Sequence, residues 1–372
     1  AISGMSVVGR DYYGAFPLRG KLLNTRTATY AQLSKNEELN NIKQILGLQA
    51  GKKYKNLSEL RYGKILIMTD ADTDGFHIKS LLINFIGNGW PELLKQNFIS
   101  SMITPVIKLS KRNDVLPFYN LSDYNKWKDS NDISGWKVKY YKGLGTSTQE
   151  EAREYFKNMK TLSYISETKD DDKSLQLAFT KTEADNRKKW ILNNIKSPKT
   201  LDYNQNKVNI KDLVDKELVL FSIEDNIRSI PNLVDGLKPS QRKIIYACIK
   251  RNLTNEIKVS QLAGYVSEHT SYHHGEQSLQ DTIINLAQEF VGSNNINLLE
   301  PVGQFGSRLY GGKDASSPRY IFTKLSKNFK DIFNPDDYNL LEYLNDDGDS
   351  IEPKFYVPTL PMILINGACG IG

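Results

Sequence analysis

The stretch KILIMTDADTDG, residues 64–75, constrains the fold more than any other part of the chain. Its first five residues are a short apolar run, typical of a strand that is buried on both faces of a sheet. Apolar residues at helical spacing follow over residues 78–85. Strand, turn and helix in this order indicate an α/β domain. Asp70, Asp72 and Asp74 then lie at the carboxyl end of the strand, where open α/β sheets bind ligands.

Three carboxylates this close repel one another, and a cation among them would relieve the repulsion. A solvated loop is one alternative, and an EF-hand calcium loop is another because D-x-D-x-D-G matches its opening half. Calcium is excluded because the twelfth position carries Leu81 in place of Glu, and because a strand precedes the loop. Magnesium prefers one or two carboxylates, water and a substrate phosphate. The stretch therefore predicts a Mg²⁺ site for phosphoryl transfer on a nucleic-acid backbone.

Composition permits a nucleic-acid partner without requiring one. The chain has 372 residues, which predicts two or three domains, and 49 Lys and Arg against 43 Asp and Glu, a net charge of +6. The two cysteines, Cys248 and Cys369, have no metal-ligand spacing and indicate a reducing compartment. No apolar run is long enough to span a membrane, so no membrane partner is expected. The abrupt start and the closing NGACGIG suggest a fragment of a longer protein.

The order of patterns predicts a multidomain chain. An α/β domain is expected over residues 1–164, with a strand in WKVKYYK and a helix that a capping box of Thr148 and Glu151 opens. A polar helical linker is expected over residues 165–212. Amphipathic helices over residues 213–335 suit a helix-turn-helix or winged-helix domain. Residues 336–372 do not close a further domain.

A second group of residues suggests a nucleophile and contacts with phosphate. Tyr320 follows Arg319 and a glycine-rich basic loop, and a guanidinium can stabilise both a phenolate and a phosphate. Most of the 20 tyrosines must serve packing, so Tyr320 stands out only through this neighbourhood. His274 belongs to a histidine pair, which suggests phosphate contact or proton transfer. Basic residues that flank a predicted helix start suit contacts with a phosphate backbone: Arg228, Lys238 and Arg242.

Several long stretches, in order, resemble one family. They are VVGRDYYGAFPLRGKLLN, LRYGKILIMTDADTDGFHIK, YKGLGTST, RSIPNLVDGLKPSQRK, YHHGEQSL, GGKDASSPRYIFT and PMILING. Over nearly its whole length the chain resembles the DNA-cleavage core of eukaryotic-type DNA topoisomerase II, a type IIA enzyme. The resemblance implies an α/β Toprim domain, a mainly helical winged-helix domain and the start of an α+β tower domain.

The resemblance also implies roles for single residues. Tyr320 would link covalently to a 5′ phosphate of cut DNA, assisted by Arg319, His274 and Arg228. Asp70 and Asp72 would bind Mg²⁺, with Asp74 as a supporting acid. Further residues would contact DNA: Arg19, Lys21, Lys238, Arg242 and, as the residue that wedges between base pairs, Ile371.

The family resemblance implies partners as well. They are double-stranded DNA and a second copy of the chain, because the tyrosine of one subunit works with the metal site of the other. A nuclear location follows from the family alone. ATP would serve the full-length enzyme only, since no G-x-x-x-x-G-K-[ST] occurs here. The family's metal-binding glutamate lies upstream of residue 1, and Cys369 stands where the family usually has Glu. A metal-dependent nuclease or primase-like protein and a non-catalytic DNA-bending module are the competing hypotheses.

Overall fold

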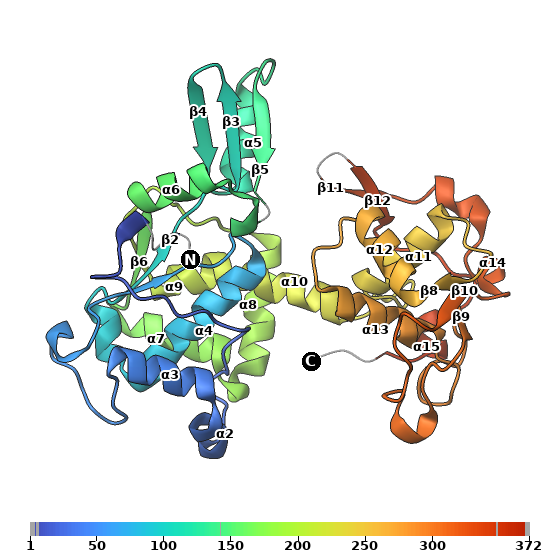
Figure 1. Cartoon of the computed structure of the whole chain (residues 1–372), viewed down its shortest axis with the longest axis horizontal. Coiled ribbons are helices and arrows are strands. Elements are labelled where there is room, and N and C mark those ends of the chain that lie inside the picture. The colour runs from blue at the N-terminus through green and yellow to red at the C-terminus, as the bar shows by residue number, and fades with distance from the viewer. Residues whose placement is uncertain (1–3, 5–6, 142, 347–348, 369–372) are drawn as a thin grey trace. The chain divides into compact units, whose positions relative to one another are not determined.

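The computed structural model describes residue 4 and residues 7–141, 143–346 and 349–368. The chain forms two compact units, Ala1–Ile223 and Glu224–Gly372 (Figure 1). Each unit has a hydrophobic core of its own.

The first unit is built on a mixed sheet in the order β1-β2-β6-β7. Its strands are β1 (Ile65–Ile67), β2 (Ile99–Met102), β6 (Thr161–Ile165) and β7 (Lys207–Asn209). β1 and β2 are parallel, with Ile65 opposite Ile99, and α4 (Thr73–Gly89) connects them. β6 is antiparallel to β2 and parallel to β7. The expected strand, turn and helix around the aspartates are therefore confirmed.

Helices surround this sheet. They are α2 (Tyr30–Lys35), α3 (Glu37–Leu46), α7 (Lys169–Phe179), α8 (Ala184–Lys196), α9 (Ile210–Leu213) and the start of α10 (Val219–Ser229). α4 is fixed to η5, a π-helical turn over Val214–Leu218, by a buried ion pair of Lys79 with Glu217 at 2.5 Å. Burial opposes the charge on Lys79, but the Glu217 carboxylate outweighs it and raises the pKa of the ammonium.

A second sheet, in the order β4-β3-β5, lies between β2 and β6 in the sequence. It consists of β3 (Ile107–Lys111), β4 (Asp114–Phe118) and β5 (Lys137–Tyr140), with α5 (Leu121–Ser130) packed against it (Figure 1). Its small core is separate from that of the main sheet and is rich in aromatic side chains. The half-exposed strand expected in WKVKYYK is β5.

The structure divides the chain differently from the sequence prediction at residues 165–212. These residues form α7, α8 and β7, and β7 is an edge strand of the main sheet. Leu175, Trp190 and Val208 are buried in the core of the first unit. The segment is part of the first unit because these apolar side chains point inward, although its composition is that of an exposed linker.

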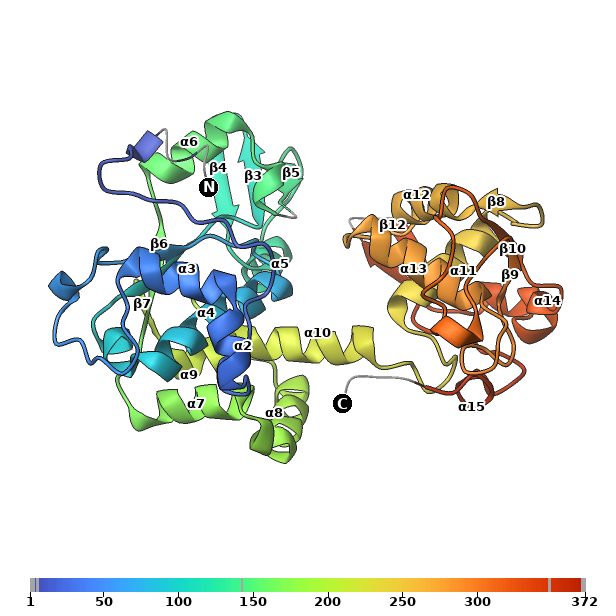
Figure 2. The ribbon, with the colours of Figure 1, turned by 60° about the horizontal axis from the view of Figure 1, so that its bottom comes forward.

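The second unit combines helices with a small antiparallel sheet. Figure 2 shows α11 (Pro239–Lys250), α12 (Val259–His269) and α13 (Glu276–Ala287) together, and they pack on one another. The sheet has the order β8-β10-β9, from β8 (Ile257–Lys258), β10 (Phe322–Leu325) and β9 (Leu299–Val302). A hairpin of β11 (Tyr343–Asp346) and β12 (Asp349–Pro353), and the short helices α14 (Phe329–Ile332) and α15 (Met362–Ile365), complete the unit. The amphipathic helices expected here are confirmed.

Candidate active site

The three aspartates lie where β1 passes into α4. Asp72 is the N-cap of α4, and its Oδ1 accepts a hydrogen bond of 2.6 Å from the backbone N–H of Gly75. Asp74 is in the first turn of the helix, and its carboxylate pairs with Lys21 at 2.7 Å. Asp70 precedes the cap and is exposed. Carboxylates around a helix N-terminus are favoured by the partial positive charge there.

Asp70 is oriented by a loop from a distant part of the chain. The backbone N–H of Leu144, in the short helix η3 (Leu144–Thr146), donates a hydrogen bond of 2.7 Å to Asp70 Oδ1. Two glycines allow this approach. A Cβ on Gly143 would lie 2.8 Å from Asp70 Oδ1, and a Cβ on Gly75 would lie 2.0 Å from the Asp70 carbonyl oxygen. Residues 143–145 and 73–75 therefore both approach Asp70 closely, the first segment at its carboxylate and the second at its backbone carbonyl.

We expect Gly143→Ala to displace the Asp70 carboxylate, because the new methyl group would occupy its position. Activity that depends on Asp70 should fall by about tenfold or more, since small displacements of a positioned group are costly. Gly145→Ala is the matched control, because a Cβ at Gly145 has no atom within 4 Å. The two variants are compared in a DNA-cleavage assay, and equal activity would contradict the positioning role of Gly143.

Glu151 fixes the end of the loop that carries Leu144. It lies in α6 (Gln149–Lys157), and the capping box with Thr148 that the sequence predicts is confirmed. Its carboxylate also accepts hydrogen bonds from Lys139 Nζ at 2.9 Å and from the Tyr141 hydroxyl. Partial burial opposes the charge, but the bonds from Lys139 and Tyr141 outweigh it and lower the pKa of Glu151 to about 2. Glu151 thus connects β5 to α6 across residues 143–146.

The depressed pKa of Glu151 predicts a pH-dependent difference in stability between the wild type and Glu151→Gln. The folded-state pKa is about 2, below the ordinary 4.5, so the stabilisation is complete above pH 4.5 and is lost as the pH falls towards 2. Its size should be that of a partly exposed ion-pair network, at most about 1 kcal/mol. Thermal unfolding of both proteins across this range measures it, because other carboxyl groups titrate equally in both. A difference that is independent of pH would contradict the assignment.

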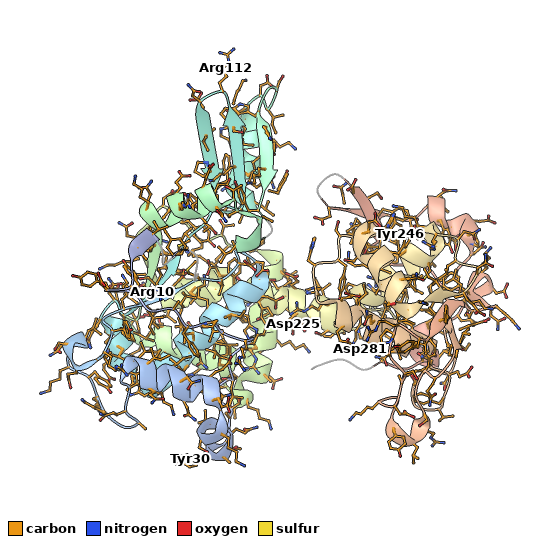
Figure 3. The ribbon with its side chains drawn as sticks, in the orientation of Figure 1. Arg10, Tyr30, Arg112, Asp225, Tyr246 and Asp281 are labelled. Atoms are coloured by element: carbon orange, nitrogen blue, oxygen red, sulfur yellow. The ribbon has the colours of Figure 1, made fainter. Side chains whose placement is uncertain are left out.

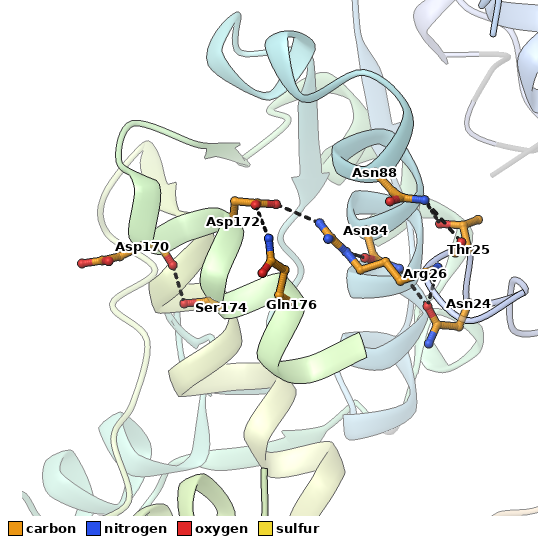
Figure 4. Close-up of polar contacts among 9 residues, drawn as sticks. All are labelled: Asn24, Thr25, Arg26, Asn84, Asn88, Asp170, Asp172, Ser174 and Gln176. Atoms are coloured by element: carbon orange, nitrogen blue, oxygen red, sulfur yellow. Dashed lines mark hydrogen bonds and ion pairs between the residues drawn. The ribbon is translucent and has the colours of Figure 1, made fainter. Parts of the chain in front are cut away.

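Lys21 is held beside Asp74 by the segment that follows it. Lys21 Nζ also lies 4.3 Å from the centre of the Phe221 ring. Further along, Arg26 Nε donates to Asn84 Oδ1 at 2.8 Å, and its guanidinium pairs with Asp172 at 2.9 Å (Figure 4). Asn84 lies on α4, so these contacts tie residues 21–26 to the helix that carries the aspartates. The exposed Arg19 has its backbone N–H bonded to Glu38.

The acidic site suits a hard cation only in part. Among the residues that the structure describes, no three His, Cys, Asp or Glu side chains are arranged to hold a metal ion together. Asp70 and Asp72 are nevertheless exposed carboxylates, each oriented by a backbone N–H. Mg²⁺ accepts one or two carboxylates when water and phosphate complete its coordination. The donors present therefore fit a Mg²⁺ site that other groups complete.

In the second unit, Tyr320 is presented on a fixed backbone. The carbonyl oxygens of Pro318 and Ile321 accept hydrogen bonds from the N–H groups of Ser260 and Val259, at 3.1 and 3.0 Å. Ile321 is buried, whereas the side chain of Tyr320 is 74% exposed. Arg319 beside it is also exposed. The anchored main chain thus directs both the phenol and the guanidinium towards solvent.

The loop before Tyr320 is ordered by a buried glutamine. Gln288 is 4% exposed and donates a hydrogen bond of 2.8 Å from its side-chain amide to the carbonyl of Phe305. Gly306 and Gly312 have positive φ angles, and a Cβ on Gly312 would lie 2.3 Å from the Gln288 amide. The N–H of Ser307 bonds to Asp314 across the loop at 2.7 Å. Sequence reasoning missed Gln288, because a single amide in a helical pattern carries no signal.

The other predicted residues of this unit differ in accessibility. His274 is exposed, with its ring edge-on to Tyr272 at 5.4 Å between centroids. Lys238 is half-buried at the N-cap of α11. Arg228 lies in the last turn of α10 and pairs with Asp225 at 3.1 Å. Ile371 and Cys369 lie outside the described residues.

The position of Arg242 in the structure differs from the one that a contact with a DNA backbone would require. It is 5% exposed, and its guanidinium makes a bidentate pair with the fully buried Asp235, at 2.7 and 3.0 Å. Asp235 also accepts hydrogen bonds from the N–H groups of Leu237 and Tyr356. Arg242 therefore links α11 to two loops in the interior. The sequence could not indicate this, because an Arg at a helix start is ordinarily exposed.

Comparison with known proteins accounts for the whole chain. Family models match the Toprim domain over residues 1–103, the C-terminal associated domain of TOPRIM over residues 102–226, and the A subunit of DNA gyrase/topoisomerase IV over residues 228–372. DNA topoisomerase 2-alpha from Gallus gallus and from Homo sapiens are each 53% identical over 389 residues and match 100% of this chain. DNA topoisomerase 2-beta from Gallus gallus is 52% identical over 396 residues.

A solved structure agrees. It is the Plasmodium falciparum topoisomerase II DNA-binding, cleavage and re-ligation domain, with a TM-score of 0.84 and 51% identity, covering 100% of this chain and 51% of that one. A Toprim domain followed by a domain of the gyrase A type, with acidic residues in the first and an exposed tyrosine in the second, defines a type IIA topoisomerase cleavage region. The chain belongs to the eukaryotic DNA topoisomerase II family. It spans about a quarter of the length of these curated relatives, 25% for the human protein.

The described helices include none that is both long and apolar enough to cross a membrane.

Proposed function

We propose that this chain is the DNA-binding and cleavage core of a type II DNA topoisomerase that cuts and reseals both strands of double-stranded DNA. The observation that carries the proposal is Tyr320, exposed beside Arg319 on an anchored backbone in a chain of this family. A phenol can attack a phosphodiester when it is accessible and when a base removes its proton or a nearby cation stabilises the phenolate.

The reaction is a transesterification. The Tyr320 oxygen attacks a backbone phosphorus, and the phenolic proton leaves to a base. The bond from phosphorus to the 3′ oxygen breaks, and the departing 3′ oxygen takes up a proton from an acid or from water. The products are a 5′-phosphotyrosyl ester and a 3′ hydroxyl. Arg319 stabilises the phenolate and the charged phosphate, and we assign supporting roles to His274 and Arg228. The reverse attack by the 3′ hydroxyl reseals the strand and needs no cofactor, because the ester retains the bond energy.

Asp70 and Asp72 are the residues that would hold Mg²⁺, with Asp74 as a supporting acid. Bound there, Mg²⁺ would supply charge neutralisation at the phosphate oxygens. The backbone N–H groups of Leu144 and Gly75 orient the two carboxylates before any ligand arrives. Three basic residues, Arg19, Lys21 and Lys238, would contact the phosphate backbone.

The wider assembly is part of the proposal. Two copies of the chain would each contribute one tyrosine, so that both strands are cut, and ATP bound elsewhere in the full-length enzyme would drive strand passage. The sequence prediction begins the winged-helix domain at residue 213, but residues 213–223 pack in the first unit, so residues 224–335 would form the winged-helix domain. Residues 336–372 would begin the tower, and Ile371 would wedge between base pairs. The relatives are eukaryotic DNA topoisomerases, which supports a nuclear location.

The test is incubation of the full-length protein with supercoiled plasmid and Mg²⁺, followed by a detergent quench. Linear DNA that is linked to protein and released by protease supports the proposal. Free 5′ phosphates would indicate a nuclease that uses water as the nucleophile, and bent but intact DNA a non-catalytic module. Either result would overturn the proposal.

For the metal site we expect Asp72→Asn to reduce cleavage by about a hundredfold or more, because loss of a charged ligand removes several kcal/mol of stabilisation. Asn retains the N-cap hydrogen bond to Gly75, so α4 should remain intact. The measurement is covalent adduct formed as a function of Mg²⁺ concentration, with circular dichroism to confirm folding. Unchanged cleavage in both Asp72→Asn and Asp70→Asn would exclude these residues as ligands.

A further inference from the structure

Lys21 forms an ion pair with one of the three aspartates at the start of α4. Its Nζ lies 2.7 Å from Asp74 Oδ1, and the two side chains are 38% and 32% exposed. Asp70 and Asp72 receive hydrogen bonds from backbone N–H groups, whereas Asp74 is paired with a full positive charge. Lys21 therefore brings to this acidic group, from within the chain, the kind of charge that a metal ion would bring.

The ring of Phe221 provides a second contact for the ammonium group. Lys21 Nζ lies 4.3 Å from the centre of this ring. His77, which lies on α4, stacks on the same ring at 3.9 Å between centroids. Phe221 lies in α10 and is buried in the core of the first unit. A cation over an aromatic face is attracted to it, so the position of the ammonium beside Asp74 is favoured from two elements.

The main chain around Lys21 is fixed, whereas its side chain reaches solvent. The next residue, Leu22, is buried in the core of the first unit. The side-chain amide of Asn24 donates a hydrogen bond of 2.8 Å to the carbonyl of Phe179. Lys carries its charge on a flexible stem of four carbons. Lys21 can therefore exchange one anionic partner for another by rotation within its side chain, while the backbone stays in place.

Lys21 and a divalent cation compete for Asp74. An ammonium in contact with a carboxylate occupies its oxygen lone pairs and repels a second positive charge nearby. A DNA phosphate offers Lys21 an alternative partner of the same sign as Asp74. Once Lys21 has moved to phosphate, the carboxylate of Asp74 remains negative close to Asp72, and the group attracts a cation more strongly.

We propose that Lys21 is a built-in counter-ion that couples DNA binding to metal binding. In the DNA-free protein its ammonium neutralises Asp74 and lowers the affinity of the acidic site for Mg²⁺, and a phosphate of bound DNA withdraws it. The inference rests on the proposed function, in which Lys21 contacts DNA and Asp70 and Asp72 hold Mg²⁺. By linkage, Mg²⁺ raises the affinity for DNA by the same factor as DNA raises the affinity for Mg²⁺.

Metal binding without DNA is the first test. The probe is Mn²⁺, whose electron paramagnetic resonance signal in water is lost when it binds to protein. Lys21→Met removes the charge and keeps a long apolar side chain. It should lower the Mn²⁺ dissociation constant of the nucleotide-free, full-length protein by about threefold to tenfold, because the charge acts on a divalent ion. A merely structural role for Lys21 predicts the opposite sign, since disorder at the start of α4 would weaken binding.

Two control variants remove a positive charge elsewhere in the first unit. Lys52 is the closest match, because its Nζ pairs with Glu59 at 3.2 Å, with exposures of 37% and 33%, and lies 4.9 Å from the centre of the Tyr54 ring. Arg112 is exposed at the turn between β3 and β4 (Figure 3) and controls for the overall charge. Lys52→Met and Arg112→Met should leave the Mn²⁺ dissociation constant unchanged.

A double-mutant cycle shows whether Lys21 acts through Asp74. Asp74→Asn should weaken Mn²⁺ binding, and in that background Lys21→Met should have a much smaller effect, because the ion pair is already lost. Equal tightening in both backgrounds would indicate a general effect of charge and would refute the proposed role. Unchanged or weaker Mn²⁺ binding in Lys21→Met alone would refute it as well.

The coupling to DNA is measured in the Tyr320→Phe background, in which no covalent complex should form. Fluorescence anisotropy gives the dissociation constant of a labelled duplex with Mg²⁺ and with EDTA, and the ratio of the two constants is the coupling factor. This factor should be about threefold to tenfold larger in Tyr320→Phe than in the same protein with Lys21→Met. Equal factors in the two proteins would contradict the coupling.

Failure of the proposed function would give a different pattern from failure of this inference. Unchanged Mn²⁺ binding in Asp72→Asn would mean that the acidic group is not the metal site, and the role of Lys21 would fall with it. Weaker binding in Asp72→Asn, together with no tightening in Lys21→Met, would leave the metal site in place and remove only the role of Lys21.

Discussion

Replacement of Tyr320 by phenylalanine is expected to eliminate the covalent protein–DNA adduct. Phenylalanine has no oxygen to attack phosphorus, and loss of a nucleophile typically costs more than about 10³-fold in rate. Folding should be unaffected, because the Tyr320 side chain is 74% exposed. The measurement is adduct formed on plasmid DNA in the presence of Mg²⁺, after a detergent quench.

Tyr310 provides the matched control for this experiment. It lies in the same glycine-rich loop and is 62% exposed, so it is the alternative phenol nearest in sequence. Tyr310→Phe should retain the adduct. The opposite pattern, with adduct in Tyr320→Phe and none in Tyr310→Phe, would reassign the nucleophile to Tyr310.

Arg242→Ala is expected to lower the free energy of unfolding by about 3–5 kcal/mol, because it leaves the carboxylate of Asp235 buried without its charge partner. Denaturant-induced unfolding of the variant and the wild type measures the loss. Lys238→Ala, at the half-buried start of the same helix, is the comparison. It should weaken DNA binding and leave stability within about 0.5 kcal/mol, as a phosphate-contacting surface residue would.

The double variant Arg242→Ala, Asp235→Ala distinguishes pairing from other effects. It should lose less stability than the sum of the two single variants, since neither charge is then left alone. Additive losses, or a fall in DNA affinity for Arg242→Ala without a loss of stability, would restore the predicted contact between Arg242 and DNA.

The part of the fold that was predictable from the sequence is the part with local patterns. The apolar run before Asp70 and the helical spacing after it are the signatures of β1 and α4, and the capping box at Thr148 gives the start of α6. Each of these elements is specified by residues that lie close to it in the sequence.

Features that depend on distant partners were not predictable. β7 has only three residues and is a strand because it pairs with β6, more than 40 residues earlier in the chain. Arg242 is buried because it forms an ion pair with the buried Asp235. The same sequence pattern would suit an exposed helix start. The hydrogen bond from Leu144 to Asp70 joins segments that are 74 residues apart. In each case a tertiary contact, absent from any local window, decides the role of the residue.

Gln288 has a consequence for the energetics of the proposed attack at phosphorus. By holding the loop through the Phe305 carbonyl, it lets folding pay the conformational entropy of ordering the segment that leads to Tyr320. A nucleophile on a pre-ordered backbone reacts at a high effective concentration, because little freedom remains to be lost on the way to the transition state. If Tyr320 is the nucleophile, as proposed, the buried amide of Gln288 would contribute to the rate of DNA cleavage through the backbone alone.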